Sequence, residues 1–187
     1  MDEFGYLSVL LSIILGLAVT QILQGFRGLL LSRARVQFYW PVIAWAFLLL
    51  LICFQSWWAM FGLRYRHNWT FQAFAVVLLQ IIFLYMSTGL IFPDFAGDTA
   101  VDLKKNFYAH RGWFFSLAVA MLGASLGKTL IFEGKLPEPT DLAFHVIFGA
   151  TFIVGAITRR EWYHKTLVVF GSAGLVLYIL LLFTRLR

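Results

Sequence analysis

Six runs of apolar residues, each long enough to cross a lipid bilayer as a helix, divide the sequence. A spanning helix needs about 20 mostly apolar residues, with a range of about 17–25. The apolar residues follow one another without the alternation of a half-buried strand, and only helices and closed barrels satisfy their backbone hydrogen bonds in lipid. The pattern therefore predicts an all-α membrane protein, a six-transmembrane-helix bundle that forms a single membrane domain over residues 1–187. The predicted spans are residues 4–25, 40–62, 71–92, 112–132, 142–158 and 166–184.

The segments between the runs are short, and the longest one joins the third and fourth runs. Its residues 98–111, DTAVDLKKNFYAHR, place Leu103 and Phe107 on one arc of a helical wheel and Asp102 and Lys105 opposite. This division predicts a short amphipathic interfacial helix in the third loop, lying on the membrane surface. Such a helix would be a connector or a docking surface for a partner.

Composition supports a membrane protein. Hydrophobic residues make up 61% of the 187 residues and charged residues only 13%, whereas a soluble domain has roughly 45–50% apolar and about 25% charged residues. Aromatic residues gather at the ends of the apolar runs, as Trp40, Trp57 and Trp113 do. This placement is typical of the aromatic belts at membrane–water interfaces. A soluble enzyme or a soluble binding domain is therefore excluded.

The distribution of basic residues predicts the orientation of the spans. Of the 15 Lys and Arg residues, nine lie in or beside the first, third and fifth loops, and six lie on the other side. Basic residues favour cytoplasmic loops, so we expect those three loops in the cytoplasm and both chain termini outside. The net charge of +6 sits at the ends of apolar runs. It indicates the lipid bilayer as a partner and no nucleic acid.

The stretch GASLGKT, residues 123–129, is similar to a phosphate-binding loop but lacks its spacing. That loop needs G-x-x-x-x-G-K-[ST] between a strand and a helix. Here only three residues separate Gly123 from Gly127, and an apolar helical run precedes them. Two small residues four apart instead let two spanning helices approach closely. We therefore expect no nucleotide partner, and we expect Lys128 to reach the interface from the outer end of the fourth span.

Uncharged polar residues inside or near the spans are candidates for helix packing or for a polar path. An amide in hydrocarbon is costly unless it is hydrogen-bonded, so each glutamine should face another helix or water. Ser12 and Thr20 belong to a ridge of small residues in 8–20, which either packs on a neighbouring helix or lines a narrow path. The intramembrane polar candidates are Ser12, Thr20, Gln21, Gln24, Gln55, Gln80, Ser87 and Thr88.

Ionisable residues near the outer boundary form a second group of candidates, because an ionisable residue in a membrane is a functional hypothesis by default. They are Asp2, Glu3, Lys128 and His145. In one interpretation the four form an outer cluster. In the other, Asp2 and Glu3 only complement the dipole of the first helix, and His145 is an interfacial histidine with a satisfied hydrogen bond.

No residue pattern indicates catalysis, a cofactor or a metal ion. The sequence shows no general acid–base pair and no nucleophile beside a base. No cluster of Cys, His, Asp and Glu has the spacing of a zinc site. His110 and His164 would meet at the rim of the bundle rather than in the core, where haem ligation would need them. We therefore expect no enzyme, and neither a cofactor nor a metal.

Five stretches spread over nearly the whole chain are informative in combination. They are SVLLSIILGLAVTQIL (8–23), FYWPVIAW (38–45), FQSWWAMFGLR (54–64), DLKKNFYAHRGWFF (102–115) and TRREWYHKTL (158–167). Together they resemble a family of uncharacterised bacterial multi-pass inner-membrane proteins, which has no assigned activity. The resemblance implies the plasma (inner) membrane of a bacterium, so that the termini would be periplasmic. It implies no functional residue. Where the family has two adjacent bases before Trp-Phe-Phe, this chain has Arg111 followed by Gly112.

The function we expect is that of a non-enzymatic accessory, assembly or sensing subunit. The loops are short, small residues form ridges, and no charged residue lies at the centre of a span. The alternative is a small oligomeric channel or transporter whose path is lined by intramembrane Gln, Ser and Thr. A membrane enzyme or electron carrier is the third interpretation. In the first two, the protein is a homo-oligomer or part of a larger membrane complex.

Overall fold

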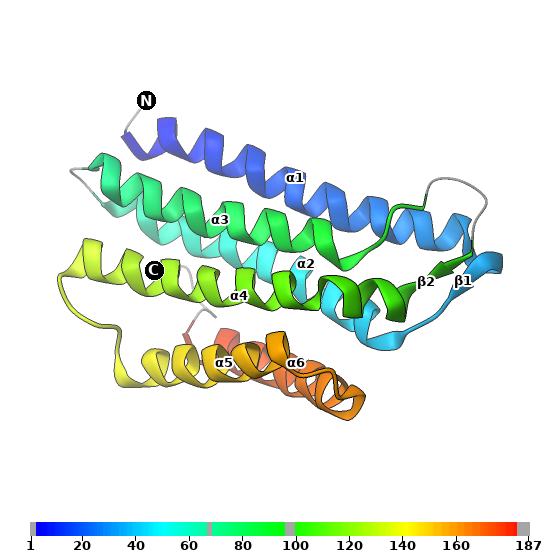
Figure 1. Ribbon diagram of the computed structural model, residues 1–187. Helices are drawn as coiled ribbons and strands as arrows, with labels where there is room; N and C mark the ends of the chain where they lie inside the picture. The colour runs from blue at the N-terminus through cyan, green and yellow to red at the C-terminus, as the bar shows by residue number, and fades with distance from the viewer. Residues whose placement is uncertain (1–2, 67–68, 96–99, 183–187) are drawn as a thin grey trace.

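The part of the chain that the structure describes, residues 3–66, 69–95 and 100–182, folds into a bundle of six long helices (Figure 1). In this computed structural model every one of them is long and apolar enough to span a membrane. The predicted all-α bundle of six long apolar helices is thereby confirmed. The helices are α1 (Glu3–Leu31), α2 (Trp40–Met60), α3 (Phe71–Ile91), α4 (Leu103–Glu133), α5 (Pro139–Ile157) and α6 (Glu161–Leu182). Shorter elements are the 3-10 helices η1 (Arg33–Arg35) and η2 (Phe61–Tyr65) and the strands β1 (Val36–Gln37) and β2 (Val101–Asp102).

Local sequence explains where several helices begin and end. The Thr70 hydroxyl accepts a hydrogen bond from the Ala73 N–H at 3.2 Å and so caps α3. Pro41 lies in the first turn of α2, where its missing N–H removes no helical hydrogen bond. Gly134 ends α4 with φ at +66°, and its N–H donates to the Leu130 carbonyl at 2.9 Å. Glycine favours this left-handed conformation because it has no Cβ.

Successive helices run in opposite directions, so the bundle has two distinct ends (Figure 1). At one end, here called the strand end, β1 pairs in parallel with β2 and joins the α1–α2 connection to the α3–α4 connection. At the other end, here called the terminal end, α1 begins and α6 ends. The sequence does not predict these strands, since two residues are too few to show an alternating pattern.

The predicted interfacial helix in the third loop is wrong as a separate element. Residues 103–111 are helical, but they form the first turns of α4, which continues unbroken through the fourth span. Asp102 starts this helix, because its carboxylate accepts a backbone hydrogen bond from the first turn at 2.9 Å. The apolar arc faces protein rather than lipid: Leu103 is 0% and Phe107 2% exposed. Residues 98–99 of the predicted helix lie outside the described residues.

Helices that are close in sequence are mostly neighbours in the bundle. α1 lies on α3 and α2, α3 lies on α4, and α4 lies on α5. α6 completes the bundle by contacting α2 and α5. The outward surfaces are strongly apolar, with Phe71 83% and Ile157 75% exposed. Such a surface suits lipid rather than water.

Two glycines let the segment after α3 approach α1 closely. A Cβ atom added to Gly25 would lie 2.1 Å from the ring of Phe92, and one added to Gly28 would lie 2.3 Å from the ring of Phe95. Any side chain at these positions would overlap a ring. The two contacts therefore depend on glycine at both positions and fix the strand end of α1.

The predicted ridge of small residues on α1 faces away from the rest of the chain. Ser12, Gly16 and Thr20 are exposed. A Cβ atom added to Gly16 would meet no atom within 4 Å. Within this chain the ridge is therefore not a packing contact, and close helix approach occurs at Gly25 and Gly28 instead.

An aromatic cluster fills the bundle between α2, α4, α5 and α6. The Trp45 ring lies 5.6 Å from the rings of Phe114 and Phe115 and 6.1 Å from that of Phe152. The cluster continues to His164, which is fully buried and stacks on Phe115 at 5.7 Å. Rings at these separations contribute attraction beyond the area they bury. The cluster holds these four helices together on the strand-end side of the bundle.

Candidate functional site

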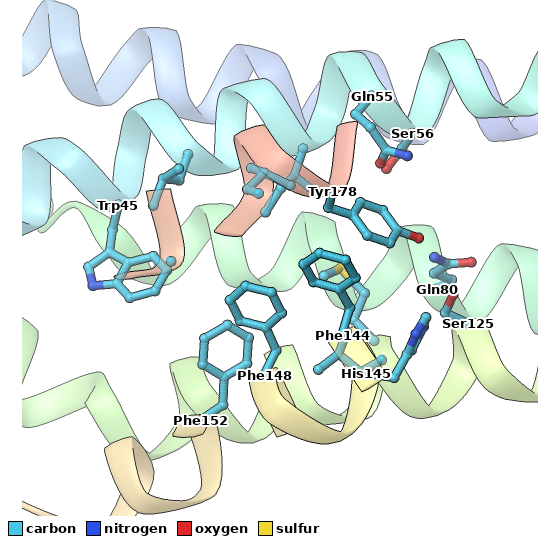
Figure 2. Close-up of a pocket in the computed structure, with 16 residues that line it drawn as sticks. Trp45, Gln55, Ser56, Gln80, Ser125, Phe144, His145, Phe148, Phe152 and Tyr178 are labelled. Atoms are coloured by element: carbon cyan, nitrogen blue, oxygen red, sulfur yellow. The ribbon is translucent and has the colours of Figure 1, made fainter. Parts of the chain in front are cut away.

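A cavity of about 130 Å³ adjoins the aromatic cluster, towards the terminal end (Figure 2). Helices α2 to α6 all contribute to its wall. Rings from Trp45, Phe148 and Phe152 surround one end, and polar side chains surround the other. The polar residues of the wall are Gln55, Ser56, Gln80, Ser125, His145 and Tyr178. The cavity is therefore divided into an apolar part and a polar part.

A second cavity, of about 100 Å³, extends the polar part. It shares five wall residues with the first, namely Gln55, Ser56, Gln80, Ser125 and Tyr178. Its own wall adds Lys128, which comes from α4. The two cavities thus form one site, here called the outer site, with rings at one end and a lysine at the other.

Asp141 and His145 form an ion pair on one turn of α5 at the outer site. Nδ1 of His145 lies 3.2 Å from Oδ1 of Asp141 and 2.8 Å from the Asp141 carbonyl oxygen. The carbonyl oxygen accepts a hydrogen bond at this distance, so Nδ1 carries the proton. The hydroxyl of Tyr178 is also hydrogen-bonded to the Asp141 carboxylate. His145 is only 7% exposed, so the carboxylate, imidazole and phenol form a network inside the bundle.

Lys128 differs from these three residues because its side-chain ammonium has no hydrogen-bond or ion-pair partner among the described residues. Its side chain is partly buried in the wall of the second cavity. Within residues 3–66, 69–95 and 100–182, no hydrogen bond or ion pair engages its ammonium group. The carboxylate of Asp141 is near enough to interact with it electrostatically, but that carboxylate already binds His145 and Tyr178.

The other predicted polar residues form a separate group nearer the strand end. The Thr88 hydroxyl lies 2.9 Å from Oε1 of Gln21 and so joins α3 to α1. Gln24 lines a groove of about 690 Å³ beside this contact. The pair matches the packing interpretation of the glutamines, in which an amide and a hydroxyl satisfy each other between helices.

Two further predicted residues are hydrogen-bonded within their own helix, and a third is exposed. The Thr20 hydroxyl donates to the Gly16 carbonyl at 2.8 Å, and the Ser87 hydroxyl donates to the Phe83 carbonyl at 2.8 Å. Such bonds satisfy a hydroxyl within its own helix. Ser12 is exposed. The residues expected along a conduction path therefore fall into two groups: Gln55 and Gln80 line the outer site, and the rest lie elsewhere.

The four predicted ionisable residues are also divided. Lys128 and His145 both belong to the outer site. Glu3 lies apart from them, because its carboxylate accepts a hydrogen bond from the backbone N–H of Trp69 at 3.3 Å. α1 packs on α3 and α2, whereas the outer-site ions are on α4 and α5. Asp2 lies outside the described residues.

Sequence reasoning missed Asp141 and Tyr178. The fifth span was predicted to begin at residue 142, but α5 begins at Pro139 and already includes Asp141. The spacing of four residues between Asp141 and His145 was a usable signal, since side chains four apart meet on a helix. Tyr178 is one of many aromatic residues in apolar runs, and no local pattern distinguishes it.

The stretch that is similar to a phosphate-binding loop lies in the interior of α4, and the residues directly before it are helical. A Cβ atom added to Gly127 would be 3.5 Å from Val76 of α3, in ordinary contact, whereas one added to Gly123 would meet nothing within 4 Å. The helix interpretation of residues 123–129 is therefore confirmed. The small-residue pair contributes to packing at Gly127 alone.

Comparisons of the chain with family models, with curated proteins and with solved structures find no match. The family resemblance noted in the sequence thus stays a prediction. Among the described residues, no group of three or more His, Cys, Asp or Glu is arranged to hold a metal ion. Function is therefore inferred from the residues of the outer site.

Proposed function

We propose that this protein is a non-enzymatic sensing subunit of a bacterial plasma membrane and binds a small amphipathic molecule in the outer site. The observation that carries the proposal is the division of the site between rings and polar groups. An apolar ligand would leave the amides and hydroxyls without partners, and a fully polar one would leave the rings against polar atoms. A ligand with an apolar body and a polar group satisfies both parts.

The orientation expected from the basic residues places the terminal end on the periplasmic side. The polar part of the outer site lies towards that end, as Gln55 and His145 do in Figure 2, and Lys128 lines the adjoining second cavity. In this arrangement the ligand enters from the periplasm with its apolar body first. The subunit would then report the ligand through a change in how α5 and α6 pack on the rest of the bundle.

Binding is proposed in place of turnover, although an Asp–His pair is also suited to acid–base chemistry. Asp141 holds both His145 and Tyr178 inside the bundle. In a sensing role this network orients the ligand and leaves it chemically unchanged. Recovery of the bound ligand in chemically unchanged form distinguishes the two roles.

The test uses the full chain in lipid nanodiscs and three phenylpropyl compounds of equal ring size, which are 3-phenylpropanol, 3-phenylpropionate and 3-phenylpropylamine. Calorimetric titration should show saturable binding of at least one, beyond that to protein-free nanodiscs. Binding should also raise the temperature of unfolding, because a ligand of the folded state stabilises it. The recovered ligand should be unchanged.

Matched variants on α4 locate the binding. Ser125 lines both cavities, so Ser125→Phe should fill the site and abolish binding. Ser116 is exposed on the same helix, so Ser116→Phe should leave binding as it is. The proposal fails if none of the three compounds binds saturably, if Ser125→Phe binds like the unaltered protein, or if the ligand is converted to a product.

A further inference from the structure

The two parts of the outer site differ in chemistry as well as in polarity. The ring-lined cavity measures about 130 Å³. An apolar cavity of about 150 Å³ in another protein holds one benzene molecule. The first cavity therefore has room for one six-membered ring, and Trp45, Phe148 and Phe152 offer faces and edges for it to pack against.

The second cavity presents a positive charge that the described part of the chain does not neutralise by direct contact. Lys128 has no hydrogen bond or ion pair there, while Gln55, Gln80 and Ser125 supply further donors around the same space. An ammonium in a partly buried site is stabilised by a counter-ion, and the effective dielectric there is lower than in water. A group with negative charge and several acceptor atoms fits these donors.

The acidic residue of the site is already engaged. Asp141 binds His145 through Oδ1 at 3.2 Å, and its carboxylate binds the Tyr178 hydroxyl as well. A cationic ligand would have to displace one of these partners and would lie beside Lys128. The charges that face the second cavity therefore favour an anion.

We propose that the ligand of the outer site is a carboxylate carried on a body the size of one aromatic ring. This inference rests on the proposed sensing function and specifies its ligand. The ring occupies the cavity between Trp45 and Phe148, and the carboxylate reaches past Gln80 and Ser125 to the ammonium of Lys128. The two cavities share the wall formed by Gln80 and Ser125, so a short linker of a few atoms joins the two parts.

The three phenylpropyl compounds test this inference on the unaltered protein. They share the ring and the linker and differ in the charge of the end group. A hydrogen bond to a charged partner contributes more than a neutral one, which corresponds to roughly a tenfold difference in dissociation constant. 3-Phenylpropionate should therefore bind about tenfold more tightly than 3-phenylpropanol, and 3-phenylpropylamine should bind more weakly than either.

Lysine variants then assign the selectivity to one residue. Lys128→Met should weaken binding of 3-phenylpropionate about tenfold and leave 3-phenylpropanol within about twofold, because only the charge is lost. Retained binding of the alcohol also shows that the variant is folded. Lys135 is exposed in the connection after α4, so Lys135→Met is the matched control and should change neither value.

The outcomes separate the two proposals. If the alcohol or the amine binds as tightly as the carboxylate, or if Lys128→Met binds the carboxylate normally, the inference of an anionic ligand is overturned and the sensing function stands. If no compound binds, both fail. Should Lys128→Met not fold, the comparison of the three compounds on the unaltered protein decides alone.

Discussion

Single residues of the outer site are informative mainly through their partners. The sequence offered Gln55, Gln80, Lys128 and His145 as separate candidates, because polar side chains in apolar runs stand out one at a time. Their meeting in one site depends on how α2 to α5 pack. No spacing within one segment encodes that packing. Of the contacts at the site, only the pair between His145 and Asp141 is local enough for sequence reasoning to find it.

The carboxylate of Asp141 joins two helices, since it binds His145 of α5 and Tyr178 of α6. We expect Asp141→Ala to lower the free energy of unfolding by about 1–2 kcal/mol, at the upper end of values for hydrogen bonds between membrane helices. Thermal unfolding of the purified protein in one detergent measures the loss. Glu138→Gln, at an exposed position before α5, should have no measurable effect. Equal stability of Asp141→Ala and the unaltered protein would show that the network contributes nothing to the fold.

At the scale of elements, the sequence predicted the spans well because the bilayer imposes their length and composition. It underestimated α1 and α4, which extend to Leu31 and back to Leu103. Helix formation does not stop where the apolar run stops, and polar residues outside the hydrocarbon remain helical when a cap such as Asp102 starts them. The same rule explains why the predicted interfacial helix is part of α4.

The docking of α1 depends on Gly25. Gly25→Ala should lower the free energy of unfolding by about 1–3 kcal/mol, the usual cost of overfilling a packed contact, because the new Cβ would lie 2.1 Å from the Phe92 ring. Gly16→Ala on the same helix meets no atom within 4 Å. That control should be neutral or stabilise by up to about 1 kcal/mol through helix propensity. Chemical denaturation of both variants in mixed micelles gives the comparison. Equal effects of the two substitutions would contradict the docking described for α1.

The end of α5 depends on a cation from α4. Arg111 donates from Nε to the Thr158 carbonyl at 3.1 Å, and its Nη1 donates to the Tyr108 carbonyl at 2.8 Å. Positive charge at the carboxyl end of a helix is stabilising. We expect Arg111→Met to cost about 1–2 kcal/mol of unfolding free energy, whereas Arg159→Met, at an exposed position nearby, should cost less than about 0.5 kcal/mol. Heat-induced aggregation, followed in detergent extracts, ranks the variants. A larger loss in Arg159→Met would refute this account of the helix end.

At the scale of the whole molecule, the fold turns scattered features into a bundle with two unlike ends. The strand end holds β1, β2 and the connection between α5 and α6, and the terminal end holds the polar part of the outer site. From the apolar runs and the basic residues, the sequence predicted that alternate loops lie on the same side of the membrane. It did not predict the strand pairing or the site, because both join segments that are distant along the chain.

Labelling of single cysteines from the two sides of the membrane tests the account most directly. The native cysteine, Cys53, is buried, so Cys53→Ala provides the background for Arg33→Cys, Arg159→Cys and Lys135→Cys, all at exposed positions. With a membrane-impermeant maleimide on intact bacterial cells, we expect Lys135→Cys to react at once and the other two only after the membrane is opened. Reaction of Arg33→Cys and Lys135→Cys from the same side would contradict a bundle whose two ends lie on opposite sides of the membrane.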